Sequence, residues 1–319
     1  MAELDDRPPG PGPGIRAAPE RAAAPVQDRA VRRATGQQSA SAARHRAGAK
    51  AGRNLPAAIA VGLGLGALVV VPLFTVRPVF LAVAVLAVAL GTWEMVHSVE
   101  REHARPPLLP LVVGGTGMLI AAWYAGPDAL LVGLLLTAVA VSLWRLAEGP
   151  DDYLRDVRTG VLVAAYVPFL AGFCILLAAP EDGARRVVTF IAAVVCSDVG
   201  GYAMGVLIGR HPMAPTVSPK KSWEGFAGSL IACLVCGVGL LTQLYHGRGT
   251  WWEGVLFGLA IAVAATLGDL GESMIKRDLS LKDMGSLLPG HGGIMDRLDS
   301  LLIAAPVAYL LLRAFVPPS

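Results

Sequence analysis

A short glycine-rich segment, residues 273–299, holds most of the side chains that could do chemistry. Apolar segments long enough to cross a bilayer flank it on both sides. Charged groups beside a hydrocarbon region are costly, so such a cluster is expected to be functional. Cations, carboxylates and flexible glycines together predict a metal-assisted reaction on phosphates. The ionisable members are Lys276, Arg277, Lys282, Asp283, His291, Asp296, Arg297 and Asp299.

Two apolar helices are expected to bring carboxylates to either side of this segment. The earlier helix contains Asp269 and is expected to continue to Lys276, and the later helix begins near Asp296. Carboxylates on facing helices suit Mg²⁺, which binds one or two of them and otherwise takes water and phosphate oxygens. Zn²⁺ would need cysteine or several histidines, and the segment offers His291 alone. Acids that begin a helix can also be ordinary caps, an alternative that leaves Asp269 unexplained.

Two further polar groups precede the segment. Asp198 and Tyr202 are four residues apart on one helix face, where the acid either serves a site or is a hydrogen-bonded packing residue. The loop at 209–223 places adjacent lysines among hydroxyl side chains, which suits a phosphate cradle. Lysines in an inner loop are equally explained by membrane topology. The polar residues considered in this region are Ser218, Lys220, Lys221, Ser222 and Glu224.

The elements that must position these residues are membrane helices. Of the 319 residues, 54% are hydrophobic and only 16% are charged, and the mean hydropathy is +0.57. This composition excludes an ordinary soluble domain and predicts an all-α polytopic membrane protein. Apolar runs of about 20 residues predict nine transmembrane helices. They lie at 55–74, 79–97, 107–125, 128–146, 159–179, 186–208, 224–245, 252–272 and 297–315.

The sequence divides into three regions. Residues 1–53 are rich in Ala, Pro, Gly and Arg and predict a disordered basic tail. Residues 54–185 predict transmembrane scaffold helices. Residues 186–319 predict a catalytic transmembrane region with cytoplasmic loops at 209–223 and 273–296, so that the site lies on the cytoplasmic side and is built from the C-terminal half.

Charge distribution orients the expected helices. The tail holds ten Lys/Arg against five Asp/Glu. With the tail placed in the cytoplasm and nine spans threaded, 22 of the 27 Lys/Arg fall on the inner side, as the positive-inside rule requires. The tail is expected to set topology or to contact anionic lipid headgroups. Nucleic-acid binding is not expected, because the tail has no aromatic residue on which a base could stack.

Glu94 is the one acid of the expected scaffold helix at 79–97. It lies near the inner end of that helix, beside Trp93. An acid at this position can extend to the membrane interface or serve a function, and the sequence leaves both readings open.

The segment 273–299 resembles the signature of the bacterial phosphatidate cytidylyltransferases, the CDP-diacylglycerol synthases. The similarity extends over about 186–300 and includes the Asp198/Tyr202 and 218–225 segments. The sequence departs from the family pattern at Gly200-Gly201, where the family has Gly-Ala. The matching positions of the signature are Ser273, Lys276, Arg277, Lys282, Asp283, Gly285, Pro289, His291, Gly292, Gly293, Asp296, Arg297 and Asp299.

This resemblance implies that CTP and phosphatidate react to give CDP-diacylglycerol and pyrophosphate. It implies that Asp269 and Asp296 bind Mg²⁺, with a second cation left open, and that Gly292 and Gly293 let the backbone approach the nucleotide. It also implies a multi-pass enzyme of the bacterial inner membrane that works on membrane lipid, and a homodimer is a further expectation. The remaining polar residues are assigned to catalysis (Lys276, Arg277, Lys282, Asp283, His291, Arg297, Asp299) or to substrate binding (Asp198, Tyr202, Ser218, Lys220, Lys221, Ser222, Glu224).

Two other functions remain as alternatives. A CTP-dependent polyprenol or phytol kinase would also use CTP at a membrane, but it would transfer the γ-phosphoryl group and release CDP. A membrane transporter would be expected to show two-fold repetition between its halves, whereas here the polar residues are concentrated in one half.

Overall fold

The computed structural model describes residues 62, 64–101, 104–245, 247–281, 283–285 and 292–317. The chain forms two units, Met1–Pro56 and Ala57–Ser319. All described residues belong to the second unit, so the predicted tail at 1–53 lies outside them.

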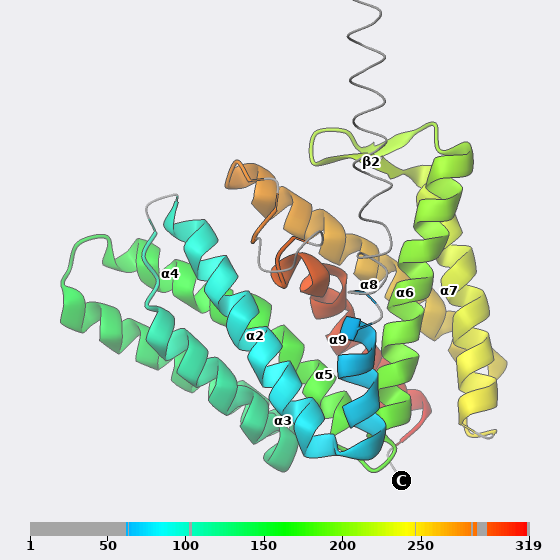
Figure 1. Ribbon diagram of the computed structural model, residues 1–319, viewed down its shortest axis with the longest axis horizontal. Coiled ribbons are helices and arrows are strands. Elements are labelled where there is room, and N and C mark those ends of the chain that lie inside the picture. Colours follow the sequence, from blue (N-terminus) through cyan, green and yellow to red (C-terminus); the bar gives the residue numbers. More distant parts are fainter. Residues whose placement is uncertain are drawn as a thin grey trace, which may run out of the picture. The chain divides into compact units, whose positions relative to one another are not determined.

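The described part of the chain is a bundle of apolar helices, which confirms the predicted all-α polytopic membrane protein (Figure 1). Within this part, seven helices are long and apolar enough to cross a membrane. A shorter apolar helix, Gly64–Thr75, precedes them. The predicted number of nine crossings stays a prediction.

Two of the predicted spans are found within the single helix α3 (Leu108–Glu148). Gly126 interrupts it with a positive φ of 79°, and Pro127 follows. A Cβ on Gly114 would touch Thr137, and a Cβ on Gly133 would touch Met118. The two halves of α3 therefore run antiparallel, and the glycines allow them to pack closely.

The first half of the bundle also contains α2 (Arg77–Glu100), which precedes α3, and α4 (Tyr153–Ala164) and α5 (Leu170–Ala178), which follow it. A short π-helical turn, η1 (Ala165–Phe169), contains Pro168 and joins α4 to α5, so that the three form one continuous span, Tyr153–Ala178. π-Turns within helices are frequent near functional sites.

The second half contains α6 (Gly183–Ile208), α7 (Trp223–Leu244), α8 (Trp251–Asp278) and α9 (Met295–Phe315). The most extensive helix contacts are those of α7 with α6 and with α8. A Cβ on Gly200 would lie 2.7 Å from the carbonyl oxygen of Gly228, so α6 and α7 nearly touch through their backbones. Small residues permit this approach.

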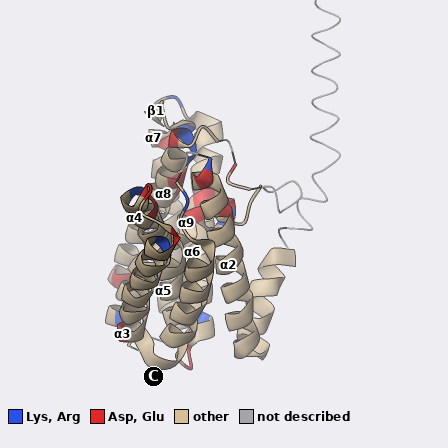
Figure 2. Cartoon of the chain, turned by 90° about the vertical axis from the view of Figure 1, so that its left-hand side faces the viewer, with Lys and Arg blue, Asp and Glu red and all other residues tan. Residues whose placement is uncertain are grey.

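The loop predicted at 209–223 contains structure that the sequence did not indicate. Strand β1 (Pro212–Ala214) pairs antiparallel with β2 (Ser218–Ser222), and α7 follows β2 directly. The hairpin covers one end of the α6–α7 pair (Figure 1). Lys, Arg, Asp and Glu gather near this end, below the hairpin and beside α8 and α9 (Figure 2). The polar chemistry is therefore concentrated at one end of the second half.

Candidate active site

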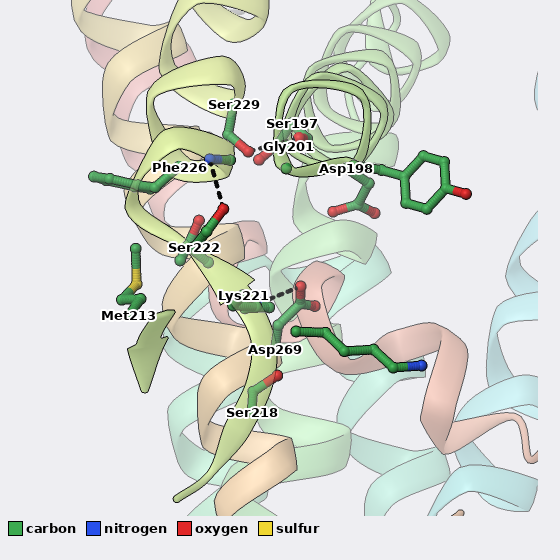
Figure 3. A pocket seen from close by; sticks show the side chains of 15 residues that line it. Ser197, Asp198, Gly201, Met213, Ser218, Lys221, Ser222, Phe226, Ser229 and Asp269 are labelled. Carbon is green, nitrogen blue, oxygen red and sulfur yellow. Dashed lines mark hydrogen bonds and ion pairs between the residues drawn. The ribbon is translucent and has the colours of Figure 1, made fainter. Parts of the chain in front are cut away.

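A cavity of about 330 Å³ lies between α6, α7, α8 and the hairpin. Its wall contains seven residues that the sequence assigned to substrate or metal binding. The Asp198 carboxylate faces this space from α6 (Figure 3). The structure thus brings together residues separated by up to 71 positions. The seven are Asp198, Tyr202, Ser218, Lys220, Lys221, Ser222 and Asp269.

An ion pair crosses the cavity wall. The Lys221 ammonium on β2 is 2.5 Å from the Asp269 carboxylate on α8, and the two side chains point toward one another (Figure 3). Each side chain is 26% exposed. The pair is accessible and offers both a cation and an anion to a ligand in the cavity, which suits a phosphate and its counter-ion.

Ser222 ends the hairpin and begins a helix. Its hydroxyl accepts a hydrogen bond from the Gly225 amide at 3.1 Å, which makes it the N-cap of α7. The cap fixes the direction in which α7 leaves β2, and so it places Lys221 next to the helix bundle. Direct contact of Ser222 with substrate stays a prediction.

Ser222→Ala is expected to lower the free energy of unfolding by about 1 kcal/mol, because the Gly225 amide loses its cap. Thermal denaturation of the purified protein in detergent measures the change. Thr242→Ala is the control, because the Thr242 hydroxyl lies in the last turn of α7 and donates to the Val238 carbonyl of the same helix. The control should denature within about 0.5 kcal/mol of wild type. An unchanged denaturation temperature in Ser222→Ala would contradict the capping role.

Glu224 lies outside the cavity wall and holds the hairpin instead. Its carboxylate accepts hydrogen bonds from the backbone amides of Arg210 and His211 at 3.1 and 3.2 Å. The His211 ring lies 2.5 Å from the same carboxylate. Glu224 therefore connects the start of the hairpin to the start of α7, and its contact with substrate stays a prediction.

A second polar cluster surrounds Asp296, in the first turn of α9. One carboxylate oxygen accepts from the Met284 amide at 3.1 Å, and the other accepts from the Gly293 amide at 2.7 Å. Lys276 of α8 lies 3.1 Å from Asp296 and 2.9 Å from Glu272. Asp296 thus joins α8 and α9 to the chain between them.

Close packing of α8 on α9 brings further carboxylates together. A Cβ on Gly268 would lie 2.6 Å from the backbone oxygen of Asp299, so the helices can cross here only because residue 268 is glycine. This crossing places Asp299 near both Asp269 and Glu272. Glu272 is 1% exposed. Asp299 of α9 therefore lies close to two acids of α8 where the helices cross.

The other predicted residues lie around this region. Arg277 is exposed and donates from Nε to the Val217 carbonyl at 3.3 Å, which connects the end of α8 to the hairpin. Asp283 and Arg297 are exposed. Gly292 adopts a positive φ of 80°, and a Cβ there would lie 2.8 Å from an Asp296 oxygen, so a larger residue would be strained and crowded. Lys282 and His291 lie outside the described residues.

The donors in this region are chemically suited to Mg²⁺. Carboxylate oxygens are the ligands that this ion prefers, and it needs only one or two when a phosphate supplies others. Within the described ranges no group of three or more His, Cys, Asp or Glu could hold a metal by itself.

Two polar residues of the first half of the bundle lie near the site, and the sequence left the role of one open and did not indicate the other. Glu94 of α2 is 1% exposed, which contradicts the reading that it extends to the membrane interface. Tyr166 of η1 has a buried hydroxyl with no hydrogen-bond partner among the described residues. It lies near Glu272 and Asp299. The acid inside an apolar helix was the available signal for Glu94, and nothing local marked Tyr166.

Comparison with known proteins gives a consistent result. The sequence pattern of the cytidylyltransferase family matches residues 56–315. A protein from Mycobacterium leprae, named phosphatidate cytidylyltransferase, is 43% identical over 82% of this chain and 89% of its own length. Proteins of the same name from Mycobacterium bovis and Synechocystis are 42% and 29% identical, over 82% and 75% of this chain and 90% and 89% of their own lengths.

Proposed function

The chain belongs to the cytidylyltransferase family, and from this membership we propose that it makes CDP-diacylglycerol and pyrophosphate from CTP and phosphatidate. It is a nucleotidyltransferase with multiple membrane helices. The observation that carries the proposal is the Lys221–Asp269 pair in the wall of a cavity at one end of these helices. The position allows a water-soluble nucleotide and a membrane lipid to meet.

The proposed reaction is an in-line displacement at the α-phosphorus of CTP. An oxygen of the lipid phosphate forms the new bond, and the bond to the bridging oxygen of the β-phosphate breaks. Negative charge grows on the pyrophosphate that leaves. Lys220 and Lys221 line the cavity and are assigned to neutralise this charge, because fixed cations contribute most where charge develops.

Asp269 and Asp296 are assigned to hold Mg²⁺, which would neutralise phosphate charge when bound. Lys276 would keep Asp296 in place through its ion pair. Asp299 lies near Asp269 and is assigned to orient the nucleotide or its ion. No covalent enzyme intermediate is required, because the lipid phosphate is itself the nucleophile.

Phosphatidate is assigned a lateral path beside α6. Tyr202 lines the cavity and is 74% exposed, and Val199 and Val206 on the same helix are 62% and 67% exposed. An apolar exposed face of this kind suits contact with lipid. The lipid headgroup would enter the cavity while its acyl chains remain in the bilayer. The proposal places the site at the cytoplasmic face of the bacterial inner membrane and the chain in a homodimer.

The phosphate of CTP that is transferred to lipid distinguishes the proposed reaction from that of a lipid kinase. Purified protein is incubated with Mg²⁺, lipid and CTP labelled with ³²P at either the α or the γ position. With phosphatidate, the α label is expected in the lipid fraction and the γ label in pyrophosphate. A kinase would place the γ label in a polyprenol and release CDP. Failure of both labels to enter lipid would favour the transporter alternative.

A further inference from the structure

Glu94 is a buried acid in a helix that the sequence assigned to the scaffold. It is 1% exposed, and one of its oxygens has no hydrogen-bond partner within the described ranges. A buried carboxylate that is incompletely paired is destabilising. A polar side chain buried in an apolar helix therefore points to a specific contact that needs a hydrogen-bond acceptor at this position.

Among the described residues, the Glu94 carboxylate contacts the chain that joins α8 to α9 and the first residue of α9. Its second oxygen accepts a hydrogen bond from the Met295 amide at 2.8 Å, across 201 positions of sequence. A Cβ on Gly293 would lie 2.5 Å from the same oxygen, and a Cβ on Gly285 would overlap the carboxylate. The glycines thus allow the backbone of this connection to lie directly against Glu94.

Ser98, one turn along α2, reaches the same connection. Its hydroxyl is placed to donate to the Met284 carbonyl, 3.1 Å away, and also to the Glu94 carbonyl at 2.8 Å within the helix. Ser98 is 2% exposed. Two successive turns of α2 therefore bind this region on both sides of residues 286–291, at Met284 and at Met295, the first residue of α9.

Asp296 binds the same stretch of backbone through other groups. It accepts from the Met284 and Gly293 amides, while α2 holds the Met284 carbonyl and the Met295 amide. The connection is therefore held between α2 and the first turn of α9, which contact one another (Figure 1). Movement of α2 would displace Asp296, because both bind the same few residues.

We propose that Glu94, assisted by Ser98, is a positioning residue that fixes the α8–α9 connection and thereby holds Asp296 in its working position. The inference rests on the proposed function for its effect on turnover. Glu94 acts as a hydrogen-bond acceptor for the Met295 amide, so glutamine can replace it and alanine cannot. The first half of the bundle is thus part of the catalytic apparatus through this contact.

The test compares Glu94→Ala, Glu94→Gln and Ser98→Ala in the full chain, with CTP, phosphatidate and Mg²⁺. Glu94→Ala is expected to lower kcat about 100-fold, since a displacement of about 1 Å can cost this much. The KM values should change less than about threefold. Glu94→Gln should remain within about threefold of wild type, and Ser98→Ala should lose about fivefold, the effect of one hydrogen bond.

A substrate-free measurement accompanies the kinetics. Hydrogen exchange of peptides that cover 292–297 should accelerate at least about tenfold in Glu94→Ala and remain near wild type in Glu94→Gln. Thr92→Val is the matched control, because Thr92 is also 1% exposed on α2 and its hydroxyl donates within the helix, to Val88. It should leave kcat and exchange at 292–297 within about twofold of wild type.

Unchanged exchange in Glu94→Ala would overturn the proposal, as would equal losses in Glu94→Ala and Thr92→Val. Equal losses in the glutamine and alanine variants would overturn the acceptor role. If the alanine variant fails to fold, Glu94→Asp carries the same test, because its carboxylate is one methylene too short to reach Met295. The exchange result decides the positioning role even if the wild-type protein makes no CDP-diacylglycerol.

Discussion

Asp269→Asn is expected to abolish cytidylyl transfer while the protein still folds and inserts in the membrane. Asparagine has nearly the same size, so packing is retained, but it cannot pair with Lys221 as an anion or offer a charged ligand to Mg²⁺. The expected fall in kcat is about 1,000-fold or more. The assay is formation of a lipid-soluble cytidine product, with size-exclusion chromatography to check the fold.

Asp278→Asn is the matched control for this change. Asp278 lies in the last turn of the same helix and is exposed. The control should retain activity within about twofold, as surface substitutions usually do. Asp296→Asn is expected to be as inactive as Asp269→Asn. Near-normal turnover with Mg²⁺ in either variant would contradict the proposed metal ligands.

Gly258→Val is expected to prevent stable folding, because it would force α8 away from α7. A Cβ on Gly258 would overlap the Cys233 carbonyl and lie 3.0 Å from the Leu234 Cα, both backbone atoms that cannot rotate away. Overpacking of a helix contact typically costs about 1–3 kcal/mol, and here the expected loss is about 3 kcal/mol or more. Thermal denaturation in detergent and the yield of monodisperse protein measure it.

Gly239→Val, on α7, is the control for Gly258→Val on α8. Gly239 belongs to α7, and no described atom lies within 4 Å of a Cβ built there. This variant should denature within about 0.5 kcal/mol of wild type, as expected for a substitution that meets no neighbour. Equal stability of the Gly258 and Gly239 variants would show that α7 and α8 do not depend on this close approach.

The sequence predicted those features that depend on local pattern. Apolar runs indicated the helices because a bilayer requires internally satisfied backbone, and this requirement acts on each segment separately. The glycines at 201, 205 and 209 are spaced four residues apart along α6 and its C-terminal end, and they pack closely against the start of α7. A Cβ on Gly201 would lie 2.5 Å from Ser229 of α7, and one on Gly209 would lie 2.7 Å from Ser222.

Other features depend on contacts that no local pattern encodes. The β1–β2 hairpin has only three and five residues in its strands, and the proline-rich sequence gives no alternation to indicate it. Glu94 and Met295 are joined by one hydrogen bond to a backbone amide, a group that every residue except proline carries. The sequence likewise did not indicate that Ser222 caps α7 through the Gly225 amide, or that Glu224 binds the Arg210 and His211 amides at the start of the hairpin.

The contact between Glu94 and Met295 has a consequence for how the protein is made. Ribosomes add roughly 5–20 residues per second, so α2 emerges about 10–40 s before Met295 is available. During that interval the Glu94 carboxylate lies in a newly synthesised helix, and the Met295 amide that binds it has not yet been translated. A chain released before the last helix is inserted would lack both that partner and Asp296, so premature termination yields an inert product.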